Sequence, residues 1–222
     1  MQRKPNDDRE PRATYIAVAG NIGSGKSTLV AYLASRHGFR SFPEPYELNP
    51  YLKDFYKNMG KWAFHSQISF LAHKFRVHLE MMGSDQPLVQ DLTIYEDAEI
   101  FARHLYRQGY MDDRDWATYR ALYEGMTQVL RPPDLLIYLR CGVRSIRQRI
   151  EMRGRVPEQN IPTKYLQALN RYYDRWVERY SAGPILVWPS DRMNYLEDLV
   201  YRLEFEERLG TLLGIRGVEV GK

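Results

Sequence analysis

The chain has 222 residues, of which 44% are hydrophobic and 27% charged, a composition typical of a folded globular protein with an apolar core. Its formal net charge of +4 comes without a run of lysine and arginine, and no apolar stretch approaches the roughly 20 residues that a membrane span requires. These features argue against a nucleic-acid partner and a membrane protein. A pocket for phosphate groups would account for the modest positive charge equally well.

The N-terminus and the cysteine content bear on the compartment in which the chain works. Residues 1–13 are polar, lack the apolar region of a signal peptide and contain acidic residues that transit peptides avoid, so we expect a disordered lead-in. The single cysteine, Cys141, cannot form an internal disulfide and lies in an apolar run, which predicts a buried thiol. We therefore expect a cytoplasmic protein.

Short apolar or β-branched segments alternate with longer segments of helical periodicity, which predicts an α/β fold with a five-stranded parallel sheet flanked by helices. The expected strands span Tyr15–Ala19, Arg40–Phe42, Leu88–Gln90, Leu135–Leu139 and Ile185–Trp188. The expected helices span Ser24–Arg36, Lys61–Met82, Tyr95–Gln108, Asp112–Leu130, Val143–Arg153, Thr163–Tyr180 and Asn194–Leu213. Residues 14–215 contain no repeat or linker-like stretch, so we predict a single domain, with a basic, mobile lid at about residues 153–160.

The strongest motif lies between the first expected strand and the first expected helix. The segment G-N-I-G-S-G-K-S-T fills the Walker A template and predicts a loop that binds the phosphates of ATP. Its glycines let successive N–H groups face one anion, its lysine neutralises the β- and γ-phosphates, and its serine can bind Mg²⁺. The predicted ATP-binding residues here are Gly20, Asn21, Ile22, Gly23, Ser24, Gly25, Lys26, Ser27 and Thr28.

A Walker A motif identifies a nucleotide site but leaves the acceptor open, and four later motifs narrow the choice. They are F-P-E-P-Y from Phe42, Y-K-N-M-G-K-W-A-F-H-S-Q from Tyr56, V-Q-D-L-T-I-Y-E-D-A-E-I-F from Val89 and R-I-E-M-R-G-R-V-P-E from Arg149. In their order and spacing the chain resembles the deoxyribonucleoside kinase family, and within it the bacterial deoxyadenosine/deoxyguanosine kinases. The resemblance runs from about Tyr15 to about Tyr180. It implies a P-loop kinase fold, Mg-ATP as phosphoryl donor, a deoxyribonucleoside 5′-hydroxyl as acceptor and a homodimer.

The resemblance assigns roles to residues near the acceptor sugar. Glu44, after the second strand, matches the family's general base, and a positioned carboxylate can accept the proton of a weakly nucleophilic hydroxyl. Tyr56 and Glu158 match the residues that hold the sugar 3′-hydroxyl. Taken alone, Tyr56 could equally be a packing residue, because tyrosines are numerous in this chain.

The same comparison assigns residues to the acceptor base. Gln67 matches a base-reading glutamine, and Phe101 matches an aromatic residue that packs on the base, although a lone phenylalanine at helical spacing is more often core. Asp97 matches an aspartate that pairs with an arginine in purine- and cytosine-accepting members, and Lys74 stands at that arginine's position. The resemblance therefore implies a purine deoxynucleoside, with adenine and guanine both open.

Arg149, Arg153 and Arg155 form a basic cluster at the end of an expected helix. Such a cluster can be a solvated helix end that complements the helix dipole. The family uses the corresponding lid to close over the donor phosphates, which implies ATP binding by Arg149 and Arg153 and stabilisation of the transferring group by Arg153 and Arg155.

One position departs from the family pattern. After the third strand the family has an acidic residue, then arginine, then serine or threonine, whereas this chain has Asp91, Leu92 and Thr93. Asp91 remains available for Mg²⁺ together with Ser27. Leu92 cannot carry the arginine's charge, so another cation such as Arg153 substitutes, turnover is impaired, or the chain was altered there.

Leu92 keeps a second reading open, that of a catalytically impaired P-loop module with a structural or regulatory role. The intact Lys26, Ser27, Glu44 and lid arginines favour the active kinase instead. A nucleoside monophosphate kinase would need basic residues to grip an acceptor phosphate, and the acceptor region offers Glu44 and neutral residues in their place.

Overall fold

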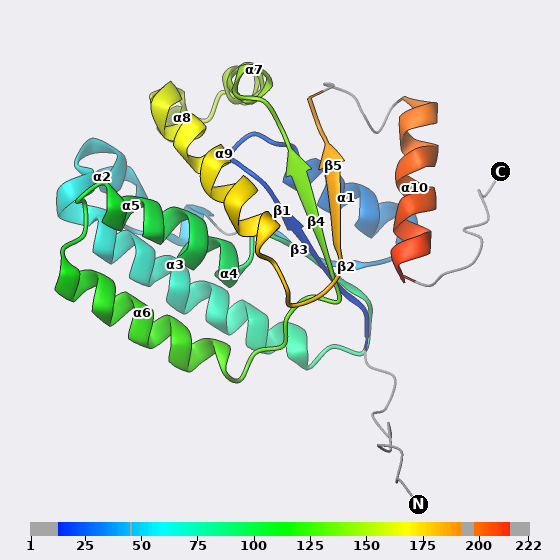
Figure 1. Cartoon of the computed structure of the whole chain (residues 1–222), viewed down its shortest axis with the longest axis horizontal. Helices are drawn as coiled ribbons and strands as arrows, with labels where there is room; N and C mark the ends of the chain where they lie inside the picture. The colour runs from blue at the N-terminus through cyan, green and yellow to red at the C-terminus, as the bar shows by residue number, and fades with distance from the viewer. Residues whose placement is uncertain (1–12, 45, 192–197, 214–222) are drawn as a thin grey trace, which may run out of the picture.

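The computed structural model of the chain describes residues 13–44, 46–191 and 198–213. All strand pairs in the sheet are parallel, and the strand order is β2-β3-β1-β4-β5 (Figure 1). The α/β fold and the five-stranded parallel sheet predicted from the sequence are confirmed. The strands are β1 (Tyr15–Ala19), β2 (Arg40–Phe42), β3 (Leu88–Asp91), β4 (Leu135–Arg140) and β5 (Ile185–Pro189).

Helices cover both faces of the sheet, as the alternating pattern predicts (Figure 1). The long helix α3 lies with α4, α5, α6 and α9 on one side, while α1 and α10 lie on the other. The helical elements are α1 (Lys26–His37), η1 (Tyr46–Leu48), α2 (Leu52–Lys57), α3 (Met59–Met82), α4 (Ile94–Glu96), η2 (Asp97–Ala102), α5 (Arg103–Arg107), α6 (Asp113–Thr127), α7 (Val143–Arg153), α8 (Val156–Gln159), α9 (Thr163–Glu178) and α10 (Leu199–Leu213).

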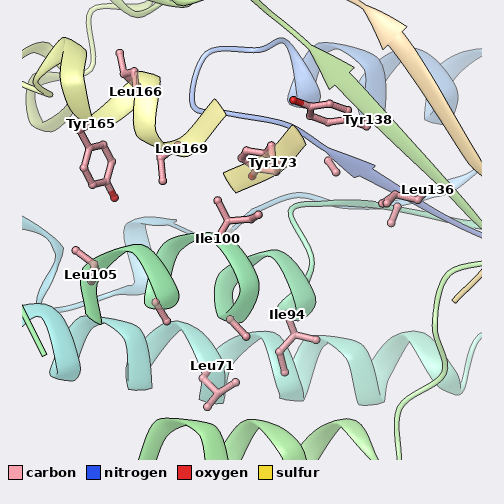
Figure 2. Packing of buried hydrophobic residues seen from close by; sticks show 14 of the residues in the cluster. Leu71, Ile94, Ile100, Leu105, Leu136, Tyr138, Tyr165, Leu166, Leu169 and Tyr173 are labelled. Atoms are coloured by element: carbon pink, nitrogen blue, oxygen red, sulfur yellow. The ribbon is translucent and has the colours of Figure 1, made fainter. Parts of the chain in front are cut away.

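The central strand β1 divides the core into two parts because successive side chains of a strand point to opposite faces. Tyr15, Ala17 and Ala19 join the larger cluster, which includes residues of α3, η2 and α9 (Figure 2). Ile16 and Val18 join the smaller cluster, which is built mainly on α1, β4 and α10. All five residues of β1 are fully buried, so this strand is a rigid base for the loop that follows it.

The strand register sets the position of the candidate site. Val18 pairs with Asp91, so the carboxyl ends of β1 and β3 stand side by side, and β2 ends next to β3. Ligands of open α/β sheets bind at the carboxyl ends of the strands, where neighbouring connections diverge. The Walker A loop, Glu44 and Asp91 all lie at this edge.

The sequence did not predict two local features. A short helix, α2, precedes α3, and the expected helix Tyr95–Gln108 is interrupted by the π-helical segment η2. π-Helical turns are rare and are concentrated at functional sites, and this one carries Asp97. Residues 1–12 of the lead-in expected over residues 1–13 lie outside the described residues, as do residues 194–197 at the start of the last expected helix. Within the described ranges, no helix is both long enough and apolar enough to cross a membrane.

Candidate active site

A cavity of about 620 Å³ opens at the carboxyl edge of the sheet and gathers residues from every motif that the sequence singled out. The predicted site residues that line it are Ile22, Gly23, Gly25, Lys26, Ser27, Thr28, Glu44, Tyr56, Gln67, Asp91, Asp97, Phe101, Arg149, Arg153, Arg155 and Glu158. The remaining predicted residues contact this lining from behind; they are Gly20, Asn21, Ser24 and Lys74. Residues that are distant in the sequence thus form one site.

The Walker A loop has the backbone shape of an anion-binding turn. Gly20 and Gly25 have positive φ angles of 149° and 101°, and a Cβ at Gly20 would lie 2.9 Å from the Leu139 carbonyl oxygen. Helix α1 starts at Lys26, so its unpaired N–H groups face the cavity. The Lys26 ammonium donates to the carbonyl oxygens of Gly20, at 2.9 Å, and Asn21, at 3.2 Å. A phosphate group could replace these carbonyls as its partner.

Ser27 and Asp91 meet across the β1–β3 edge. The Ser27 hydroxyl donates to Asp91 Oδ2 at 2.6 Å. The other carboxylate oxygen, Asp91 Oδ1, is buried and accepts no hydrogen bond within the described part of the chain. A hydroxyl beside a carboxylate with spare acceptor capacity is a donor set suited to Mg²⁺.

Glu44 follows β2 and is half-buried on the cavity wall. Burial raises the pKa of the Glu44 carboxyl, while the positive charges of Lys74 and Lys26 act in the opposite direction. Asp91 and Asp97 raise the pKa further. A carboxyl with a raised pKa, close to the phosphate loop, has the properties of a general base.

The far end of the cavity is built from α2, α3 and η2. Gln67 on α3 is almost completely buried, and its Oε1 atom has no hydrogen-bond partner among the described residues. Lys74, two turns further along α3, lies 2.8 Å from Asp97 Oδ2, and both side chains are buried. This buried ion pair sets the charge of the wall next to Gln67.

Tyr56 and the lid face each other across the cavity mouth. Burial and the nearby carboxylates of Glu158 and Glu44 raise the pKa of the Tyr56 phenol, which therefore stays protonated. Glu158 forms ion pairs with Arg153 and, at 3.4 Å, with Arg155. The predicted sugar-binding residues and lid arginines thus belong to one charged cluster.

Arg149 is placed differently from the other lid arginines. Its guanidinium donates to the carbonyl oxygens of Ser24, at 2.9 Å, and Ser190. The side chain therefore ties α7 to the Walker A loop and to the residue after β5, while it still lines the cavity.

Leu92 is the one non-glycine residue with a positive φ angle, 57°, in the described ranges. It is buried and lines the cavity directly after Asp91. Left-handed backbone is unfavourable for a residue with a Cβ and is concentrated at functional sites. The departure from the family motif therefore lies at a strained position on the wall of the site.

The sequence reasoning missed several apolar lining residues. Phe70 stands three residues after Gln67, so helical spacing could have placed it on the same face. Tyr165 carried no such signal, because its position depends on how α9 packs over the cavity. The other missed side chains of this kind are Leu52, Phe55 and Met152.

Residues 16–208 match the family model described as deoxynucleoside kinase. The chain belongs to the deoxynucleoside kinase family. A deoxyadenosine/deoxycytidine kinase of Bacillus subtilis is 38% identical over 190 residues, which cover 85% of this chain and 88% of that protein. A deoxyadenosine kinase of Dictyostelium discoideum is 36% identical over 83% of this chain and 73% of its own length. A deoxyguanosine kinase of B. subtilis is 34% identical over 73% of this chain and 77% of its own length.

Solved structures of deoxynucleoside kinases agree with this assignment. The structure of deoxyadenosine kinase from M. mycoides with bound dATP has a TM-score of 0.77 and 29% sequence identity, and the match covers 89% of this chain and all of that one. The chain is therefore a deoxynucleoside kinase, an enzyme that phosphorylates nucleosides. No comparison supports the catalytically impaired module that Leu92 had suggested.

Proposed function

We propose that this deoxynucleoside kinase transfers the γ-phosphoryl group of Mg-ATP to the 5′-hydroxyl of a purine deoxyribonucleoside. The proposal combines a phosphate-binding loop, the half-buried Glu44 carboxyl and a base pocket within one cavity. It assigns the Walker A side of the cavity to ATP and the α2–α3–η2 side to the acceptor.

On the donor side, the N–H groups of the loop and Lys26 bind the phosphates. Ser27 and Asp91 would hold Mg²⁺, in agreement with their 2.6 Å contact and with the unpartnered Asp91 Oδ1. When bound, the ion neutralises phosphate charge. Arg153 and Arg155 stabilise the transferring group, and Arg149 keeps the loop and α7 together.

On the acceptor side, Glu44 removes the proton of the 5′-hydroxyl, a role that its raised pKa supports. Tyr56 and Glu158 hold the 3′-hydroxyl, and Phe101 packs on the base. Glu158 must then share its carboxylate between the sugar and the lid arginines. The lid can therefore sense whether the sugar site is occupied.

The single observation that carries the preference for a purine is the buried Gln67 amide beside the Lys74–Asp97 pair. Its Oε1 atom lacks a partner among the described residues, and a buried acceptor of this kind is costly unless a ligand satisfies it. A glutamine amide can accept from the adenine amino group and donate to a ring nitrogen. The three curated relatives described above are each named for deoxyadenosine or deoxyguanosine, and one of them is named for deoxycytidine as well.

A panel of acceptors tests the proposal. With ATP and Mg²⁺, kcat/KM for deoxyadenosine or deoxyguanosine should exceed that for thymidine by about tenfold or more. Deoxycytidine is the informative control, because its amino group could also satisfy Gln67. A higher kcat/KM for thymidine or deoxycytidine than for both purines would contradict the purine assignment.

The family resemblance also leads us to propose a homodimer in the cytoplasm. Sedimentation at several protein concentrations tests the dimer. A single species with the mass of one chain at every concentration would contradict it.

A further inference from the structure

Glu96 is a fully buried carboxylate that the proposed reaction does not use. Its Oε2 atom accepts hydrogen bonds from the Thr93 N–H, at 2.8 Å, and the Thr93 hydroxyl, at 3.2 Å. Its Oε1 atom accepts from the Gly20 N–H, at 3.3 Å, and the Tyr173 hydroxyl, at 3.1 Å. Four donors on one buried carboxylate are more than the capping of a short helix requires.

These bonds join three segments that the reaction must hold together. Gly20 is the first residue of the Walker A loop, and Thr93 begins the helical segment that carries Asp97 into the base pocket. Tyr173 lies on α9, the helix after the lid, stacks on the Tyr138 ring and belongs to the same buried cluster as Ile100 (Figure 2). Glu96 therefore connects the donor loop with the acceptor wall.

Gly20 is held through both of its backbone polar groups. Its N–H donates to Glu96, and its carbonyl oxygen accepts from Lys26 at 2.9 Å. If Lys26 turns toward the phosphates of ATP, the bond from the N–H to Glu96 still holds the residue at the start of the loop.

The charged groups around Glu96 act against each other. Burial raises the pKa of the Glu96 carboxyl to about 7, although Lys26 from α1, Lys74 from α3, the Thr93 N–H and the Tyr173 hydroxyl all favour the ionised form. Tyr15 and Tyr180 also face this region, and burial raises the pKa of both phenols, so they stay neutral. A pKa of about 7 makes the protonation state of this carboxyl sensitive to pH near neutrality.

We propose that Glu96 is a positioning residue whose ionised carboxylate holds the Gly20 peptide against the helix of Asp97, so that the donor phosphates and the acceptor base are aligned. This inference rests on the kinase activity proposed above. Ionisation matters because each carboxylate oxygen accepts two hydrogen bonds, and the Gly20 N–H can only donate. Protonation of Oε1 would reverse its bond with the Tyr173 hydroxyl and make that oxygen a poorer acceptor for the Gly20 N–H, so the link between the donor loop and the acceptor helix weakens.

Two variants test this role by the dependence of kcat/KM for ATP on pH. In the unmodified enzyme, kcat/KM should rise as pH increases through about 7, the pKa of Glu96. Tyr173→Phe removes a hydrogen bond that stabilises the ionised form, so its inflexion should move to higher pH. Glu96→Gln should lack this inflexion. At about pH 8 it should be slower by about tenfold or more, because a misplaced site loses rate at that scale.

The shift between the unmodified enzyme and Tyr173→Phe identifies Glu96, because Glu44 also titrates with a raised pKa and would give an inflexion in all three proteins. Thermal melts at each pH show that the variants are folded under assay conditions. An identical inflexion in the unmodified enzyme and Tyr173→Phe, or a folded Glu96→Gln with full activity, would overturn the role of Glu96. An unmodified enzyme without turnover at any pH would instead overturn the kinase proposal.

Discussion

Leu92 combines a left-handed backbone with a buried leucine side chain at the wall of the reaction site. Such a conformation costs about 1–3 kcal/mol for a residue with a Cβ, and surrounding contacts must impose it. The Leu92 N–H donates to the Val18 carbonyl oxygen at 3.3 Å, so the strand ladder extends into the strained residue and fixes it. The sheet therefore fixes the backbone conformation at residue 92, and a substitution can change the side chain without changing that conformation.

Leu92→Arg tests what the side chain contributes. An arginine here would add a preorganised positive charge beside the acceptor oxygen, with Asp91 available to orient it. We expect kcat to rise by about tenfold and KM for the nucleoside to change less. Steady-state kinetics of the purified variant decide the matter, with Leu92→Met as a control of similar volume without charge. A lower or unchanged kcat would contradict the hypothesis that the site lacks a positive charge at this position. It would indicate that another arginine, such as Arg153, already supplies that charge.

Glu44→Gln tests the general base at the same scale. The amide keeps the size of the side chain but cannot accept the 5′-hydroxyl proton, so kcat should fall by about hundredfold or more with a smaller change in KM. Because burial raises the pKa of Glu44, the unmodified enzyme should also lose activity as pH falls through that pKa. A loss confined to KM would show that Glu44 binds the acceptor without accepting its proton.

At the scale of secondary-structure elements, the Lys74–Asp97 pair joins α3 to the π-helical segment η2. Burial raises the pKa of Asp97, and the Lys74 ammonium opposes that shift. Removing one partner leaves the other charge buried and unpaired, which is more damaging than removing both. The pair therefore links the shape of the base pocket to the stability of the packing between the two elements.

Lys74→Met, Asp97→Ala and their combination separate these contributions. Each single variant should lose about 3 kcal/mol or more of unfolding free energy, and the combined variant should lose less than the sum. The combined variant should also prefer purines less strongly, because a neutral wall replaces a charged one. Denaturant unfolding and the four-nucleoside panel measure the two effects. Additive losses with an unchanged substrate ranking would show that the pair is neither coupled nor selective.

The elements also show which parts of the fold could be predicted from the sequence. The strands and most helices follow from local periodicity, and the Walker A loop follows from its glycines and flanking elements. The π-helical segment η2 could not be predicted, because local periodicity does not mark where a helix gains the extra residue of a π-turn. The capping box between Thr93 and Glu96 is local, but the other donors to Glu96 come from residues 20 and 173, which only the fold brings together.

At the scale of the whole molecule, two buried groups, His78 and Glu96, make the free energy of unfolding depend on pH in opposite directions. His78 is buried and lies 3.0 Å from the Arg131 carbonyl oxygen through Nε2, and burial lowers its pKa from 6.5 to about 4. Between these two pKa values the histidine is protonated in the unfolded chain and neutral in the folded chain. The free energy of unfolding therefore falls as pH decreases from 6.5 to about 4. Glu96, whose pKa rises from 4.5 to about 7, binds a proton more readily when folded, so it adds stability over a similar range.

His78→Gln should therefore flatten the loss of stability in acid. The glutamine amide can donate to the Arg131 carbonyl oxygen and does not titrate, so about 3 kcal/mol of pH dependence between about pH 6.5 and 4 should disappear. Glu96→Gln serves as a control with the opposite effect. It removes a group that adds stability as pH falls, so the loss of stability in acid should become steeper. Denaturant unfolding at several pH values measures both slopes. Parallel curves for His78→Gln and the unmodified protein would contradict a neutral buried histidine.

The strand order has a consequence for the chain as it leaves the ribosome. β1 is made first but is central, and one of its two partners, β4, is made only after residue 134. Until then the nascent chain can pair β1 with β3 alone, and the other edge of this strand, which is buried in the finished fold, stays open to unwanted pairing. The residues that form the phosphate loop, the base pocket and the metal ligands are thus synthesised before the sheet that supports them can close.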